Sequence, residues 1–70
     1  MHTLDDLKAG RLRGIARLDL SAGLEHFPPE IFDLADSLEV LNLSDNALHS
    51  LPADLGRLHR LKILFCSNNH

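Results

Sequence analysis

The 70-residue chain contains no tryptophan, no tyrosine and a single cysteine. One cysteine excludes an internal disulfide framework. The first ten residues, MHTLDDLKAG, lack the apolar segment of a signal peptide, and no apolar run approaches the roughly 18 residues needed to cross a membrane. These absences predict a cytoplasmic protein with no membrane partner.

Basic residues are scarce in the middle of the chain, where no lysine or arginine lies between Arg17 and Arg57. The formal net charge is −3, whereas a dedicated nucleic-acid binder is expected to be strongly basic. We therefore expect no nucleic-acid partner. Eight of the ten acidic residues fall between Asp19 and Asp54, so the charge along the chain is basic, then acidic, then basic.

Leucine is abundant, and its positions repeat. The segments IARLDLSAG from Ile15, LEVLNLSDN from Leu38 and LKILFCSNN from Leu61 align with a period of 23 residues. Periods of 20 to 50 residues are typical of proteins built from stacked repeats. A chain this short buries only about 60% of its unfolded surface, so stacking of the repeats has to supply its core.

Each repeat begins with a pattern that predicts a short strand. In VLNL (40–43), a period of two directs Leu41 and Leu43 inward, while Val40 and Asn42 point outward. Leu41 and Leu43 belong to two of three apolar columns that recur every 23 residues. We predict that the columns are structural: Ile15/Leu38/Leu61, Leu18/Leu41/Leu64 and Leu20/Leu43/Cys66.

The second half of each repeat predicts a different local structure. Leu55, Leu58 and Leu61 are spaced by three, which favours a short helical or 3-10 segment, and Pro52 is tolerated in its first turn. This segment returns the chain to the next strand. The expected fold class is α/β, with short parallel strands joined by short helical or 3-10 return segments.

Residues 38–58, LEVLNLSDNALHSLPADLGRL, resemble the pattern LxxLxLxxNxLxxLPxxLxxL of the leucine-rich-repeat family. The resemblance covers residues 15–70 and implies a solenoid with repeats at 15–37, 38–60 and a truncated 61–70. It also implies that Asn46 and Asn69 turn inward to satisfy main-chain groups of the loops. The first repeat departs from the pattern, because Gly23 stands where asparagine is expected and one residue is missing.

Residues 1–14 precede the repeats and are predicted to form an N-terminal helical cap. Thr3 and Asp6 have the spacing of a capping box and Gly10 is a typical helix stop, so we expect a helix from about Leu4 to Ala9. A solenoid needs a capped end to stay soluble. A docking helix is the alternative interpretation.

The outward columns are the candidate partner-binding site, because the family resemblance implies that the strands line a concave face that holds the ligand. Val40, Ile63 and Phe65 form an apolar patch that the fold does not require, and an aromatic anchor with polar neighbours is typical of binding hot spots. The alternative is that Phe65 merely favours a strand or is covered by further repeats. The predicted site consists of Arg17, Asp19, Val40, Asn42, Ile63 and Phe65.

No catalytic or metal site is expected. Cys66 occupies the inward column of Leu20 and Leu43, so we predict a small buried core residue and not a nucleophile. The five histidines form neither HExxH nor HxxxH and are interpreted as surface residues. No metal or other cofactor is therefore predicted.

The repeat period also predicts two ion pairs between neighbouring repeats. Glu39 and Lys62 are 23 residues apart and should lie side by side on adjacent strands. An offset of 24 on the return segments pairs Asp33 with Arg57. Both pairs are interpreted as contacts that help set the register between turns.

Two functions remain open. The first is a non-enzymatic protein–protein interaction module. MHTLDDLKAG, LDLSAGLEHFPPEIFDLADSLEVLNLS and ILFCSNN resemble the N-termini of bacterial leucine-rich-repeat proteins that continue into a protein-kinase-like region, which implies the recognition part of a longer multidomain protein. The chain itself has no Gly-rich phosphate loop, HRD or DFG motif. The second is a small structural unit that dimerises through the uncapped C-terminal edge at ILFC.

Overall fold

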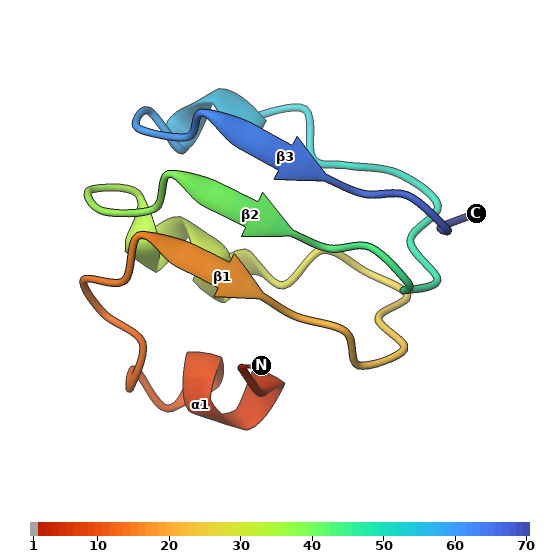
Figure 1. Ribbon diagram of the computed structural model, residues 1–70, viewed down its shortest axis with the longest axis horizontal. Coiled ribbons are helices and arrows are strands. Elements are labelled where there is room, and N and C mark those ends of the chain that lie inside the picture. Colours follow the sequence, from red (N-terminus) through yellow and green to blue (C-terminus); the bar gives the residue numbers. More distant parts are fainter. Residues whose placement is uncertain (1) are drawn as a thin grey trace.

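The structure is a computed structural model that describes residues 2–70. In chain order its elements are helix α1, strand β1, the 3-10 helix η1, strand β2, the 3-10 helix η2 and strand β3. The strands lie side by side in one layer, the return segments lie behind them, and α1 lies beyond β1 (Figure 1). The bounds are α1 Leu4–Lys8, β1 Arg17–Asp19, η1 Pro29–Leu34, β2 Val40–Asn42, η2 Leu55–Arg57 and β3 Ile63–Phe65.

The three strands form a parallel sheet in the order β1-β2-β3. Leu18 pairs with Leu41, and Leu41 pairs with Leu64, so neighbouring strands are offset by the 23 residues of the sequence repeat. The predicted parallel strands and 3-10 return segments are confirmed.

The core lies between the sheet and the return segments and consists almost entirely of leucine. Leu18 and Leu41 come from the inward face of the sheet, while Ile31 and Leu34 come from η1. Each buried leucine contributes roughly 1.5–3 kcal/mol. The buried apolar residues are Leu7, Leu18, Leu20, Leu24, Ile31, Leu34, Leu38, Leu41, Leu43, Leu48 and Leu58.

Helix α1 begins at the capping residue that the sequence indicates. Oγ1 of Thr3 accepts a hydrogen bond from the N–H of Asp6 at 3.1 Å. The chain leaves the helix through Gly10, whose φ of +76° favours glycine. Leu7 is buried in the core and Leu4 packs against it, so the helix shares the core of the repeats.

The loop after β1 is one residue shorter than the loop after β2, and its residue in the left-handed conformation is a glycine. Asp45 and Asn68 take the left-handed conformation in the second and third loops, with φ of 63° and 58°. In the first loop Gly23 has a φ of +64°. Glycine adopts this conformation without steric cost, and Asn and Asp tolerate it better than other side chains.

Cys66 differs from its prediction, because its thiol-bearing side chain is exposed and not part of the core. The alternation correctly places it in the column of Leu20 and Leu43, which are both buried. Those two leucines are covered by the turn that follows each of them, and no such turn follows Cys66 within residues 2–70. Leu64, the neighbouring inward residue, is half-buried for the same reason.

One predicted ion pair forms and the other does not. Nζ of Lys62 lies 3.4 Å from Oε1 of Glu39, as the 23-residue offset predicts. The prediction for Asp33 and Arg57 was wrong. Arg57 instead contacts Asp54, three residues earlier on the same turn, at 3.1 Å, and its guanidinium lies 4.2 Å from the ring centroid of Phe32.

Candidate interaction surface

The outward face of the sheet carries an apolar group on β2 and β3. Among residues 2–70, Ile63 and Phe65 are the large hydrophobic residues that remain exposed, at 47% and 46%. Val40 lies beside Ile63 in the register, Asn42 lies beside Phe65, and both are half-buried. Alternation along three-residue strands thus brings Val40, Ile63 and Phe65 together on one face, which we call the apolar patch.

The polar side of the same face is a fixed ion pair on β1. Arg17 and Asp19 are two residues apart on one strand, so their side chains share a face. The guanidinium donates two hydrogen bonds to the carboxylate, Nε to Oδ2 and Nη2 to Oδ1, each 2.9 Å long. This two-point geometry is the strong form of an arginine–carboxylate contact.

The ion pair shifts the titration of both partners. The hydrogen bond from Arg17 is the largest influence and lowers the pKa of Asp19 below its usual range. Burial is the next largest and opposes it, while a hydrogen bond with Asn42 and the positive charge of Arg17 lower the pKa further. The hydrogen bond to Asp19 raises the pKa of Arg17. Because each charge is already matched, this side of the face offers a partner fixed polar groups with little net charge.

His2 joins this side of the face, a contact that the repeat pattern did not predict. Its main-chain N–H donates to the carbonyl oxygen of Asp19 at 3.1 Å, and its Nδ1 accepts the N–H of Asp19 at 3.1 Å. An accepting Nδ1 requires the tautomer protonated at Nε2. Residues 1–14 have no counterpart at the 23-residue period, so the sequence carried no signal for this contact.

Asn46 holds the loops at the carboxyl ends of β1 and β2. Its Oδ1 accepts the N–H groups of Ala22 and Leu24 at 3.0 and 3.1 Å. Its Nδ2 donates to the carbonyl oxygens of Leu20 and Leu43, both at 2.9 Å. The carboxamide therefore satisfies loop groups of its own turn and of the turn before it.

Asn69 repeats this arrangement one turn later. Its Oδ1 accepts the N–H of Leu48 at 3.0 Å, and its Nδ2 donates to the carbonyl oxygens of Leu43 and Cys66 at 3.0 and 2.9 Å. Each asparagine thus serves the preceding loop. The first repeat has no repeat before it, which gives a physical reason for Gly23 at its asparagine position.

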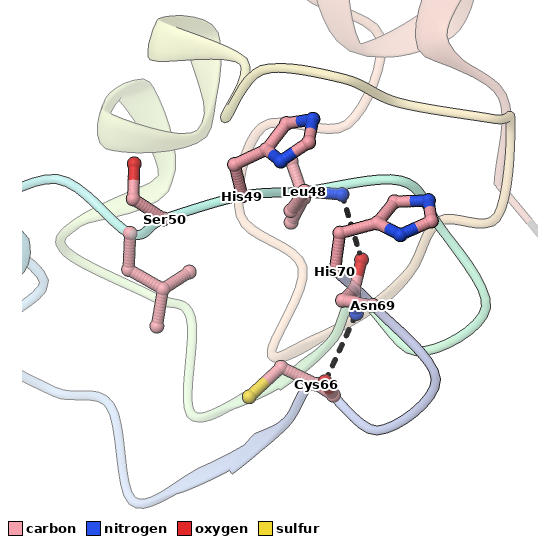
Figure 2. A pocket seen from close by; sticks show the side chains of 7 residues that line it. Leu48, His49, Ser50, Cys66, Asn69 and His70 are labelled. Carbon is pink, nitrogen blue, oxygen red and sulfur yellow. Dashed lines mark hydrogen bonds between the residues drawn. The ribbon is translucent and has the colours of Figure 1, made fainter.

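A pocket of about 210 Å³ lies at the end of the molecule near the C-terminus. Figure 2 shows Cys66 on one side of it and the rings of His49 and His70 on the other. These rings stack with their centroids 5.4 Å apart. Among residues 2–70, no group of three or more His, Cys, Asp or Glu side chains is placed to hold a metal ion.

A second pocket, of about 320 Å³, lies between α1 and the segment at residues 24–30. Leu4 and Lys8 line it from the helix, and Phe27 and Glu30 line it from the return segment. Within the described part of the chain, no helix is long and apolar enough to cross a membrane.

Parallel strands that recur with the sequence repeat, and an exposed outward face of their sheet, define this chain as a repeat protein. Residues 36–70 match the family model described as leucine-rich repeats in two copies. The chain belongs to the leucine-rich-repeat family. Repeats of this family generally mediate protein–protein interaction.

Two curated relatives extend the comparison. The chain is 44% identical over 66 residues to leucine-rich repeat and WD repeat-containing protein 1 of Homo sapiens, and 39% identical over 62 residues to the protein of that name in Mus musculus. Each match covers 89% of this chain but only 10% and 9% of the relatives, so the chain spans about a tenth of their length. No solved structure gives a significant match.

These two relatives support only the assignment of the chain to the leucine-rich-repeat family. Their printed names join leucine-rich repeats to WD repeats and mention no kinase, and both organisms are eukaryotes. The bacterial origin and the kinase-like continuation therefore stay predictions.

Proposed function

We propose that this chain is a non-enzymatic module that binds a protein partner through the exposed face of its sheet. The observation that carries the proposal is the exposure of Ile63 and Phe65, at 47% and 46%, in a chain whose leucines are otherwise largely buried. Full burial of such side chains contributes roughly 1.5–3 kcal/mol each. Nothing inside the fold uses this free energy, so it is available for binding.

The polar side of the face supports the same proposal. The Arg17–Asp19 pair is held by two hydrogen bonds at 2.9 Å, so a partner meets groups that are already ordered. Preordered groups reduce the entropy lost on association. We therefore expect a partner whose apolar side chain covers Phe65 and whose polar groups contact the rim formed by Arg17, Asp19 and Asn42.

The test uses a binder selected from a displayed peptide library against the 70-residue chain. Phe65→Ser, alone or with Val40→Ser, should abolish binding and leave the circular dichroism spectrum unchanged. Arg60→Ser is the control, because Arg60 is exposed and lies outside the strands. Binding that survives Phe65→Ser but is lost on Arg60→Ser would refute the proposed face.

We further propose that the chain is the N-terminal recognition part of a longer multidomain protein, in which the repeats form a solenoid and residues 1–14 cap its first turn. The support is the small share of the relatives that it spans and the packing of Leu7 in the core. A kinase-like continuation, a bacterial source and a cytoplasmic location belong to the same proposal. Sequencing the native transcript past the codon for His70 tests the continuation directly.

A further inference from the structure

The pocket between α1 and residues 24–30 is separate from the exposed sheet face. The residues that line it run from Leu4 to Glu30, and none of them belongs to that face. Its volume is about 320 Å³, at the lower end of the roughly 300–1,000 Å³ that is typical of ligand sites. A pocket of this size suits one large side chain better than a cofactor.

The inner wall of the pocket is apolar and held in place. Leu24 and Phe27 both line it. Leu24 is buried, its N–H donates to Oδ1 of Asn46 at 3.1 Å, and its carbonyl oxygen accepts from the N–H of Ala47 at 2.8 Å. The ring of Phe27 packs against that of Phe32, with the centroids 5.5 Å apart. A wall that is already ordered reduces the entropy lost when a ligand binds.

Glu30 brings a carboxylate with an unused acceptor to this pocket. Its Oε1 is shielded from solvent and has no hydrogen-bond partner among residues 2–70. A buried acceptor without a partner costs free energy, so such an atom in a folded protein calls for an explanation. The side chain as a whole is half-buried and lines the pocket. Because the terminal torsion of a glutamate is broad, a small rotation offers an oxygen to a donor in the pocket.

Lys8 lines the same pocket from α1 and restricts the kind of donor that fits. Its positive charge disfavours a cationic side chain beside it and attracts the face of an aromatic ring, most strongly that of tryptophan. An indole ring also satisfies the other two features. Its apolar body matches the wall, and a buried indole N–H usually finds a hydrogen-bond acceptor.

We propose that this pocket binds a tryptophan side chain of a partner protein, with the indole N–H donating to the Glu30 carboxylate and the ring packed between Phe27 and Lys8. A protein is the source that fits, because repeats of this family generally mediate protein–protein interaction. Tryptophan is also enriched among the residues that dominate binding at protein interfaces.

A pair of fluorescent probes tests the hydrogen bond. The chain contains no tryptophan, so the emission of an added indole reports binding without background. The probes are N-acetyl-tryptophanamide and its analogue methylated at the indole nitrogen, each titrated with the 70-residue chain. The methyl group removes the donor, so the analogue should bind roughly tenfold more weakly, as expected for a hydrogen bond to a carboxylate. Equal affinity of the two probes would overturn the proposal.

Glu30→Met tests the residue, because it removes the acceptor and keeps a long side chain. The two probes should then bind with equal affinity. The urea midpoint of this variant should be no lower than that of the parent chain, since Oε1 has no partner to lose among residues 2–70. Glu25→Met is the matched control, because Glu25 is exposed and lies outside the pocket. A preference for the N–H probe that persists in Glu30→Met would contradict the assignment.

Competition experiments test the occupant. N-acetyl-argininamide should not displace the tryptophan probe, and free tryptophan should bind no more tightly than the blocked amide. Displacement by the arginine compound would indicate a cation site, and tighter binding of free tryptophan would indicate a site for a small molecule, so either result would overturn the proposal. Phe65→Ser should leave probe affinity unchanged, which keeps failure here distinct from failure of the proposed sheet face.

Discussion

Asn46 accepts a hydrogen bond from the main-chain N–H of Leu24, which lies 22 residues earlier on the preceding turn, at 3.1 Å. The same side chain donates to the carbonyl oxygen of Leu20 on that turn. The asparagine of the repeat therefore joins two turns. Asn46 is itself buried in the core, with 8% of its surface exposed.

Replacing Asn46 by alanine should be the most damaging polar substitution in the chain. It leaves the N–H groups of Ala22 and Leu24 and the carbonyl oxygen of Leu20 without their partner, at about 1–3 kcal/mol for each buried group. A domain of this size is stable by only about 4–10 kcal/mol. Urea titration should show a loss of at least about 3 kcal/mol or complete unfolding.

Asn69→Ala is the matched control, because Asn69 makes the corresponding bonds at a half-buried position. Its free energy of unfolding should fall less than that of Asn46→Ala. Equal losses for the two variants would show that burial does not set the cost.

The stability of the chain should depend on pH through Asp19. The hydrogen bond from Arg17 lowers the pKa of Asp19 in the folded chain, so this carboxylate stabilises the fold fully above its unfolded-state pKa of about 3.9. The contribution is lost as the pH falls through the folded-state pKa. Asp19→Asn should therefore be less stable than the unsubstituted chain at pH 7, with the difference vanishing in strong acid.

Thermal unfolding followed across the acid range measures this difference. Glu25→Gln supplies the control, because Glu25 is an exposed acidic residue of the loop after β1 and lies outside the ion pair. A difference between Asp19→Asn and the parent chain that stays constant down to strong acid would contradict the assigned role of the Arg17 contact.

Arg57 should stabilise the return segments through Phe32 and Asp54. Arg57→Ala removes a cation–π contact at 4.2 Å and an exposed ion pair at 3.1 Å, so we expect a loss of about 0.5–1 kcal/mol in urea titration. Asp33→Ala should have little effect. A double-mutant cycle that couples Asp33 to Arg57 more strongly than Phe32 to Arg57 would contradict this arrangement.

Cys66 should react with a thiol reagent in the folded chain. Its exposure predicts modification by an aromatic disulfide reagent at a rate close to that of the unfolded chain. Mass spectrometry of the native and urea-unfolded samples measures the two rates. Strong protection in the native sample at low concentration would mean that Cys66 is buried.

The repeat period predicted the sheet because a constant offset fixes both the direction of the strands and the register in which they pair. Leu18, Leu41 and Leu64 are 23 residues apart and occupy adjacent strands in the structure. The same pattern misjudged Cys66, because alternation fixes the direction of a side chain but not whether another turn covers it. The pattern also predicted the two outward columns that contain Ile63 and Phe65, and the structure adds that both side chains are exposed.

Contacts outside the strand columns were harder to predict. Arg57 lies on a return segment, where Asp54 and Phe32 are both within reach of a long side chain, and the 24-residue offset could not decide among them. His2 precedes the first repeat, so its hydrogen bonds to Asp19 have no periodic equivalent. Both contacts depend on side-chain geometry that a period does not encode.

Amide chemical-shift mapping with the selected binder tests the partner-binding face most directly. Addition of the binder to ¹⁵N-labelled chain should shift the amides of Arg17–Asp19, Val40–Asn42 and Ile63–Phe65, and leave those of residues 30–34 and Leu55–Arg57 in place. That result would place the partner on the exposed sheet face. Shifts centred on the return segments, with the strands unchanged, would contradict the account.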